Sequence, residues 1–210
     1  MIILIQTAKA EDYDYGFDLE AGCDFRSSWQ LGIDLRYCFL DNLMVKGGFR
    51  FQEVPEHSLS RHEKNIEWEI EDADLVNYLF PLSISYEIPL NKEKKESNDF
   101  WALFIKPGVI FQPFAADRFT AKITDYQSKK SWHEYYHQNF EWMRLFWSCK
   151  AGVVYKTGND FDIYCGYEIN NQDSYAKRRD SEIKGFHFKD HICKEKSAYH
   201  YLFLGFVIYY

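Results

Sequence analysis

The stretch that decides the fold is Ala198 to Tyr210, which reads AYHYLFLGFVIYY. Taken in steps of two, it places apolar residues on one face and small or aromatic residues on the other: Leu202, Leu204, Phe206, Ile208 and Tyr210 against Tyr201, Phe203, Gly205, Val207 and Tyr209. A period of two is typical of a β-strand. Because the apolar run ends with the sequence, we expect it to pair with an earlier strand or to insert into an apolar environment.

Seven more segments with the same alternation precede this stretch. The expected strands cover about residues 14–25, 29–39, 43–52, 76–88, 101–111, 144–156 and 161–169. Helices cannot produce this period, so the sequence predicts an all-β protein with eight strands in total.

The expected connections alternate in length. Short or compact turns fall at about residues 40–42, 91–99 and 158–160, whereas long polar loops are expected at about 54–73, 112–139 and 171–197. Transmembrane barrels have short turns at one end and long loops at the other, and strands of about 11 to 13 residues suit a tilted crossing. The predicted fold is an eight-stranded antiparallel up-and-down transmembrane β-barrel.

The closing stretch also resembles the final strand of the small eight-stranded outer-membrane β-barrels of Gram-negative bacteria, the OmpA-type barrels. That strand ends in an aromatic residue with Gly-x-x-apolar-x-aromatic spacing, matched here by Gly205, Ile208 and Tyr210. Phe203 departs from the pattern, because the family usually has a polar residue there. The resemblance implies a bacterial outer-membrane location for nearly the whole mature chain.

Length and charge limit the protein class. A chain of 210 residues suits one domain, and no apolar run approaches the roughly 18 residues of a transmembrane helix. The net charge of −7, without a long basic stripe, disfavours nucleic-acid binding. We expect residues 1–10 to be the remnant of a signal peptide and residues 11–210 to form a single barrel domain. Five cysteines without paired spacing do not indicate a disulfide framework.

The polar face of the strands is predicted to point into the barrel. By our assignment the apolar face carries roughly nineteen aromatic rings, too many for the interior of eight strands. The polar face carries eight of the eleven glycines, and small residues belong where space is short. The apolar face then contacts lipid. The charges on the inner face are expected to form an ion-pair network with water rather than a solute pore.

The turn at Gly158-Asn159-Asp160 sets the register of the strands that flank it. A three-residue loop places Thr157 opposite Phe161, which keeps both apolar sets on one face. The same register puts Lys150 opposite Glu168 and Lys156 opposite Asp162, as ion pairs inside the lumen.

The same register bears on two of the cysteines. Cys149 and Cys165 lie four residues out of step on neighbouring strands. They are therefore predicted not to form a disulfide bond.

Three features suggest chemistry. His133-Glu134-Tyr135-Tyr136-His137 is a literal H-E-x-x-H sequence, which on a helix would place His133 and His137 as weak zinc-ligand candidates, with Glu168 as a third ligand. The polar flanks and the return to strand alternation speak against a zinc peptidase. The other two features are a cluster of His57, Ser58, Ser60 and His62, and the basic run Lys177-Arg178-Arg179, which could meet glycolipid phosphates. Both are better explained as solvated loops.

The expected function is non-enzymatic. We predict a structural or surface-binding barrel that acts through long extracellular loops, is monomeric, contacts outer-membrane lipid and uses no cofactor or metal. The alternatives are an outer-membrane enzyme that modifies lipid and a soluble carrier of lipocalin type. Fold analogy carries much of this expectation.

Overall fold

The structure, a computed structural model, describes residues 15–25, 28–40, 42–54, 60–63, 65–90, 99–157, 161–173, 175–180, 182–183, 186–187 and 198–210. The expected signal-peptide remnant, residues 1–10, lies outside the described residues. The barrel strands are β1 (Tyr15–Asp24), β2 (Trp29–Leu40), β3 (Leu43–Val54), β5 (Ile66–Pro89), β6 (Phe100–Asp125), β7 (Lys130–Lys156), β8 (Phe161–Asn170) and β11 (Tyr199–Tyr209). Smaller elements are β4 (Ser60–Glu63), α1 (Ala176–Arg179), β9 (Glu182–Ile183) and β10 (Phe186–His187).

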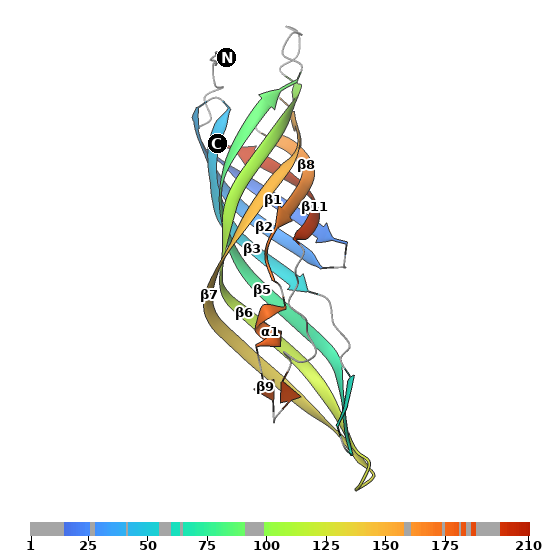
Figure 1. Cartoon of the computed structure of the whole chain (residues 1–210). Coiled ribbons are helices and arrows are strands. Elements are labelled where there is room, and N and C mark those ends of the chain that lie inside the picture. Colours follow the sequence, from blue (N-terminus) through green and yellow to red (C-terminus); the bar gives the residue numbers. More distant parts are fainter. Residues whose placement is uncertain are drawn as a thin grey trace.

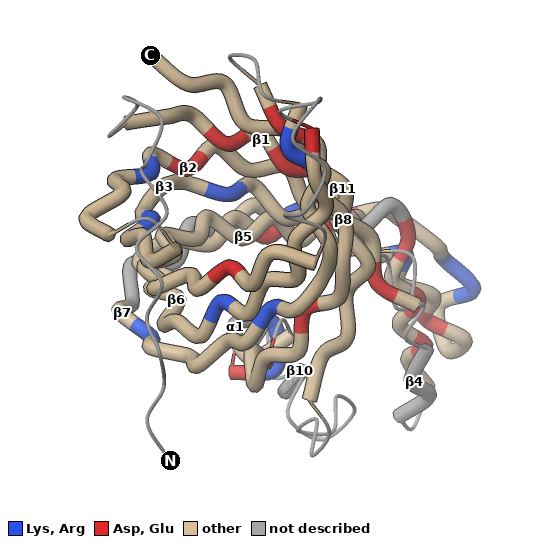
Figure 2. Tube along the Cα trace, turned by 90° about the horizontal axis from the view of Figure 1, so that it is seen from above, with Lys and Arg blue, Asp and Glu red and all other residues tan. Residues whose placement is uncertain are grey.

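These eight long strands close into an antiparallel barrel. The strand order is β3-β2-β1-β11-β8-β7-β6-β5-β4, and an additional pairing between β3 and β5 completes the ring. The start of β1 and the C-terminus lie side by side, since the Tyr210 amide donates to the Tyr15 carbonyl, at the end of the barrel with the short turns (Figure 1). Seen from that end, acidic and basic positions are spread around the ring (Figure 2). The predicted fold, an eight-stranded antiparallel barrel, is confirmed.

The outer surface is an apolar belt. Its exposed side chains alternate with buried polar ones along each strand, as the period-2 pattern predicted, and include Leu31, Ile33, Leu35, Leu82, Ile84, Leu103, Ile105, Ile163, Leu204 and Ile208. Ile33 is 52% exposed and Leu82 is 51% exposed, whereas Asp34 between two belt positions is 3% exposed. Exposure of so large a continuous apolar surface to water would be unfavourable in free energy, so the belt faces lipid.

Three strands are much longer than predicted. β5, β6 and β7 have 24, 26 and 27 residues, whereas the other barrel strands have 10 to 12. The expected loops at 54–73 and 112–139 are therefore largely wrong: β4 and β5 occupy much of the first, and β6 and β7 continue to a turn at residues 126–129 in the second. We call the part of this sheet beyond the barrel the extension, and it runs to the bottom of Figure 1.

The physical reason for this error is a change of environment along the strands. Outside the membrane the outer face of a strand meets water and becomes polar. Glu67, Glu69 and Glu71 occupy that face on β5, opposite Thr124, Lys122 and Thr120 of β6. An acid-rich segment that looks like a loop is thus a strand with one face in water.

Irregularities in the ladders mark the place where the extension leaves the barrel. The register shifts between Tyr78 and Phe80 in the β5–β6 pairing, and between Gln112 and Phe114 in the β6–β7 pairing. Bulges bend a strand and increase its twist. Because these shifts lie at neighbouring positions on adjacent strands, they bend the sheet as a unit.

No helix among the described residues is long and apolar enough to span a membrane.

An arginine introduced at the centre of the apolar belt should be far more costly than one at its edge. We expect Ile33→Arg or Leu82→Arg to lower the free energy of unfolding by about 2 to 4 kcal/mol, and Leu40→Arg, at the turn end of β2, by about 1 kcal/mol or less. Denaturant unfolding in lipid vesicles, followed by tryptophan fluorescence, measures the difference. Equal costs at both depths would contradict the placement of the belt.

Candidate functional site

The lumen holds two clusters of charge. The end cluster, nearer the termini, contains Asp18, Arg36, Lys46, Glu87, Lys156 and Asp162; the central cluster contains Glu20, Asp34, Arg50, Lys106, Lys150 and Glu168. Each has three carboxylates and three cationic side chains, so each is neutral as a whole. Charges in so enclosed a space persist when they are paired.

The expected pairs lie within these clusters. The register of β7 and β8 places Lys150 opposite Glu168 and Lys156 opposite Asp162, as the turn length predicted. Lys150 Nζ lies 3.0 Å from Glu168 Oε2, and Lys156 Nζ lies 2.9 Å from Asp162 Oδ2.

Cys149 lies opposite Ile169 and Cys165 opposite Val153 in the same register. Both cysteines are free thiols.

Other ion pairs cross the lumen and tie distant strands together. Lys150 on β7 also contacts Glu20 on β1, and Arg50 on β3 lies 3.2 Å from Glu168 on β8. Lys106 Nζ on β6 lies 3.6 Å from Asp34 Oδ2 on β2. These contacts fill the interior and hold opposite walls at a fixed distance.

An aromatic cluster also lies in the lumen, and it was not predicted. Phe104, Tyr164 and Phe203 surround one another with ring centroids 6.0 to 6.2 Å apart. A Cβ atom at Gly166 would lie 2.9 Å from Phe203 Cζ, and one at Gly205 would lie 2.4 Å from Tyr164 Cζ. The inward glycines thus make room for rings. The sequence feature that could have indicated this cluster is Phe203, because the resembling barrels usually have a polar residue at that position.

The H-E-x-x-H sequence does not form a zinc site. It lies in strand β7, where successive side chains alternate between faces, and the pairing puts His133 and His137 on the outer face and Glu134 on the inner face. Histidines four residues apart in a strand are separated by roughly 13 Å. Glu168 is buried in the central cluster. Within the described part of the chain, no group of three or more potential metal ligands is gathered.

The histidine and serine cluster and the basic run, the other two candidates from the sequence, differ in how far the structure describes them. His57 and Ser58 lie outside the described residues, and Ser60 and His62 belong to β4. In the basic run, Arg178 is completely buried and its Nε donates to both oxygens of Asp117 at 3.0 and 3.1 Å. Arg179 lies 2.7 Å from Asp173. Both arginines therefore form ion pairs within the protein.

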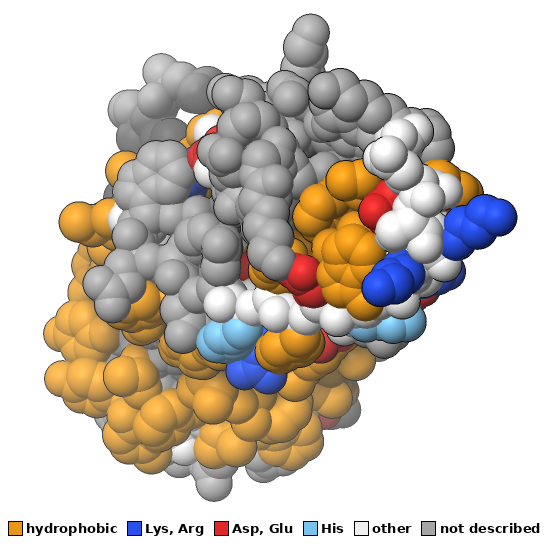
Figure 3. Space-filling view, turned by 90° about the horizontal axis from the view of Figure 1, so that it is seen from below, with side chains coloured by type: hydrophobic (Ala, Val, Ile, Leu, Met, Phe, Trp, Pro, Cys, Tyr) orange, Lys and Arg blue, Asp and Glu red, His pale blue; other side chains and the backbone are white. Residues whose placement is uncertain are grey.

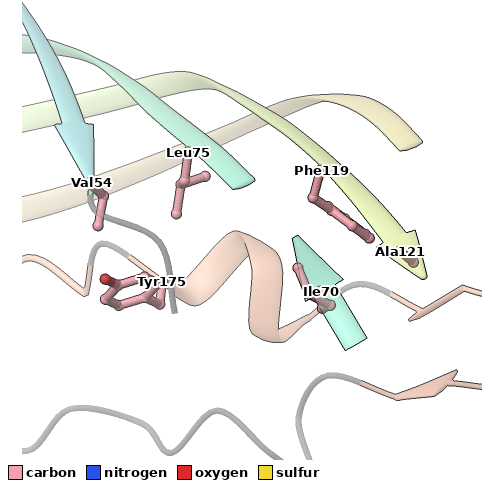
Figure 4. Packing of buried hydrophobic residues seen from close by; sticks show 6 residues of the cluster. All are labelled: Val54, Ile70, Leu75, Phe119, Ala121 and Tyr175. Atoms are coloured by element: carbon pink, nitrogen blue, oxygen red, sulfur yellow. The ribbon is translucent and has the colours of Figure 1, made fainter. Parts of the chain in front are cut away.

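The segment that carries α1 packs against the inner face of the extension. Tyr175 is 3% exposed and belongs to an apolar cluster with Val54, Ile70, Leu75, Phe119 and Ala121, drawn in Figure 4. The Arg178 guanidinium lies 5.9 Å from the ring centre of Phe119. The segment after β8 therefore folds back and fixes the base of the extension to the barrel mouth.

Polar amides connect that base to the lumen. Gln52 accepts hydrogen bonds from Gln172 at 2.7 Å and from Asn77 at 3.0 Å, and it donates to Tyr201. Ser28 in turn lies 3.0 Å from the Tyr201 hydroxyl. The end of the lumen next to the extension is thus crossed by hydrogen bonds between neutral side chains. The rest of the lumen is crossed by ion pairs.

Beyond α1 the two faces of the extension differ in character. The outer face is polar, and Lys122 lies 3.0 Å from Glu69 while His133 Nε2 lies 3.4 Å from Glu71. The inner face carries Trp132, Glu134 and Tyr136 on β7. Tyr136 donates to Glu134 at 2.6 Å, and burial together with this hydrogen bond raises the pKa of the Tyr136 phenol. Sequence reasoning missed this surface because it assigned the segment to a loop.

Loss of one partner in the central cluster should leave a buried charge without an oppositely charged partner. We expect Glu168→Gln to destabilise the barrel by about 3 kcal/mol, because Lys150 and Arg50 both lose a carboxylate partner. The double variant Lys150→Met with Glu168→Met should cost less than the sum of its single changes. Unfolding titrations of the unchanged protein, the two single methionine variants and the double variant measure this double-mutant cycle. Strict additivity of the losses in unfolding free energy would contradict the coupling.

Removal of the buried arginine should release the α1 segment and leave the barrel intact. Arg178→Met leaves Asp117 buried without its cation, which typically costs about 3 to 5 kcal/mol. We expect faster proteinase K cleavage within residues 171–187, while heat-modifiable gel migration stays unchanged. Arg179→Met is the matched control and should have a smaller effect, since that side chain is only partly buried.

Comparisons with known proteins find distant similarities among solved structures. No protein-family model and no curated protein matches the chain. Among solved structures it is similar to the N-terminal β-barrel domain of Pseudomonas aeruginosa OprF, at 9% identity and a TM-score of 0.46, over 93% of this chain and 96% of that chain. It is also similar to Neisserial surface protein A, at 10% identity and a TM-score of 0.41, over 93% of this chain and 94% of that chain.

A third match is Ail of Yersinia pestis, crystallised with the heparin analogue sucrose octasulfate, at 13% identity and a TM-score of 0.33, over 93% of this chain and 94% of that chain. The identities and TM-scores are low, so the assignment rests on the closed strand order and the apolar belt described above. The chain is an eight-stranded antiparallel transmembrane β-barrel.

Proposed function

We propose that the protein is a non-enzymatic outer-membrane barrel that binds a ligand at the cell surface through the extension. The observation that carries this proposal is the length of β5, β6 and β7, which continue about 10 residues or more past the other strands. A barrel that served only to span the membrane would need no such structure. Binding residues are commonly placed on segments that a rigid scaffold supports.

The filled lumen supports a binding role over transport. Charged, aromatic and amide side chains occupy it from the end cluster to the mouth. Eight strands leave little space beyond their own side chains. The working surface is therefore the exterior above the membrane, and the protein acts there as a monomer anchored in outer-membrane lipid.

Shortening of the extension tests this function. Residues Lys122 to His133 are replaced by an Asn-Gly turn that joins Ala121 to Glu134, which are cross-strand partners. The variant should fold, as judged by heat-modifiable migration, and should lose the binding of cells or purified surface components that the full protein confers on a non-binding strain. Undiminished binding by the shortened variant would contradict the proposal.

A further inference from the structure

One edge of the extension has no partner strand among the described residues. β7 pairs with β6 on one side, and β8 covers its other side only from Ser148 onward. Just before that point the Asn171 amide donates to the Trp147 carbonyl at 3.3 Å, and the Trp147 amide donates to Asn171 Oδ1 at 2.8 Å. We call the stretch from Ser131 to His137, which lies beyond these contacts, the open edge. The opposite edge of the extension differs, because β4 pairs with β5 there.

Alternation along β7 decides which residues present backbone groups at the open edge. In a paired strand the N–H and C=O groups of one residue point to the same side, and the side alternates from residue to residue. Trp147 directs both of its groups away from β6, toward Asn171. Even-numbered side chains of β7 point inward along its length, since Phe146 is buried and Tyr136 lies opposite the buried Phe119. The alternation is therefore continuous, and the odd-numbered residues direct their N–H and C=O groups to the open side.

The open edge lacks the features that usually protect an exposed strand. Such strands are commonly protected by proline, by lysine, by a bulge or by a covering segment. The stretch from Ser131 to His137 contains no proline, lysine or arginine, and its pairing with β6 has no register shift. Ser131, His133, Tyr135 and His137 thus offer their N–H and C=O groups in a regular row, which is long enough for a strand of ordinary length.

We propose that the open edge binds an extended segment of another polypeptide, which joins the sheet as an antiparallel strand beside β7. This inference rests on the proposed function and names the ligand class for it. An added strand satisfies the main-chain groups of the edge, while the side chains on its two faces decide which sequence is accepted. The antiparallel direction matches the other pairings of the extension and is the more stable arrangement.

A second copy of this chain in the same membrane does not fit the open edge. All copies in one membrane have their extensions on the same side, so their β7 strands run in the same direction. Two open edges could pair in the antiparallel direction only if one barrel were inverted. The added strand therefore comes from a different polypeptide.

The outer face beside the open edge favours an acidic segment. His133, Tyr135 and His137 are exposed on this face, and Arg118 of β6, also exposed, lies opposite His137. Asp74 is the other cross-strand neighbour of Arg118, but no ion pair joins the two in the described part of the chain. A view from the end of the extension shows histidine, hydrophobic and basic side chains next to one another (Figure 3). Carboxylates beside the two histidines, with β-branched residues between them, complement this face.

A short strand-forming peptide tests the proposal. The probe is acetyl-TVEVTVEVT-amide with a fluorescent label, and its valine amides are methylated so that it can pair along one edge only and cannot assemble with itself. Its glutamates then lie on the outer face, at the spacing of His133 and His137. Fluorescence anisotropy with the protein in detergent micelles measures the affinity. The probe should bind, and the same peptide with every amide methylated should bind more weakly by about tenfold or more.

Tyr135→Pro is the variant specific to the edge. The Tyr135 N–H group points to the open side, so proline there removes an edge donor and no hydrogen bond to β6. It should lower the affinity for the probe about tenfold, whereas Tyr135→Thr, which keeps the N–H group, should lower it by about threefold or less. Heat-modifiable gel migration checks that both variants fold, and the methylated peptide tests the edge without any variant.

A second pair of variants tests the charge preference. Arg118→Gln should weaken binding of the probe about threefold and leave unchanged the binding of a peptide with glutamine in place of glutamate. Glu67→Gln is the matched control, because Glu67 lies on the same outer face but on β5, the strand beyond β6. It should not change either affinity.

Equal binding of the probe and the fully methylated peptide, or no binding of the probe at millimolar concentrations, would overturn the inference. That outcome is distinguishable from failure of the proposed function. If the shortened variant loses surface binding while the probe does not bind the full protein, the extension has a different ligand. If the shortened variant retains surface binding, the extension is not the binding element.

Discussion

The structure depends on one constraint, which is that every backbone polar group inside lipid needs a hydrogen-bond partner within the protein. An open sheet would leave two edges unpaired, and the pairing of β3 with β5 removes them. Closure with eight strands fixes a narrow interior, and the strict alternation of strands then divides the side chains into two sets. The apolar set faces lipid and the polar set is enclosed. The two neutral charge clusters and the glycines beneath the aromatic rings are consequences of that enclosure.

The same constraint ends where the membrane ends. β8 pairs with β7 only from Ser148 onward, and in the part of the chain that the structure describes no strand pairs with the same edge of β7 between Lys130 and Trp147. Such an edge would be intolerable in lipid and is permitted in water. The extension can therefore exist only above the bilayer, and its faces follow different rules. Its outer face becomes polar, while its inner face remains partly apolar because Tyr175 and Arg178 pack against it.

Sequence reasoning succeeded where the environment is uniform and failed where it changes. The eight strands and the inward direction of the polar face follow from the alternation, because lipid on one side and the lumen on the other enforce it. The register of β7 and β8, with Lys156 opposite Asp162, agrees with the register expected from the turn length. The extension was missed because Glu67, Glu69 and Glu71 were read as loop residues, although they alternate with Ile66, Trp68 and Ile70. The acidic character of one face obscured a period of two that was present. The contacts of Arg178 could not be predicted, since they join residues 61 positions apart through the fold.

The division between barrel and extension also explains where a function can arise. The lumen residues are coupled to one another across the barrel, so a change at Glu168 affects Lys150 and Arg50 together. A site there could not vary without loss of the scaffold. The extension lies beyond these coupled residues, and its base is fixed by the ion pair of Arg178 with Asp117. A change of surface residues on the extension therefore leaves the ion pairs of the membrane-spanning part in place, whereas a change in the lumen does not.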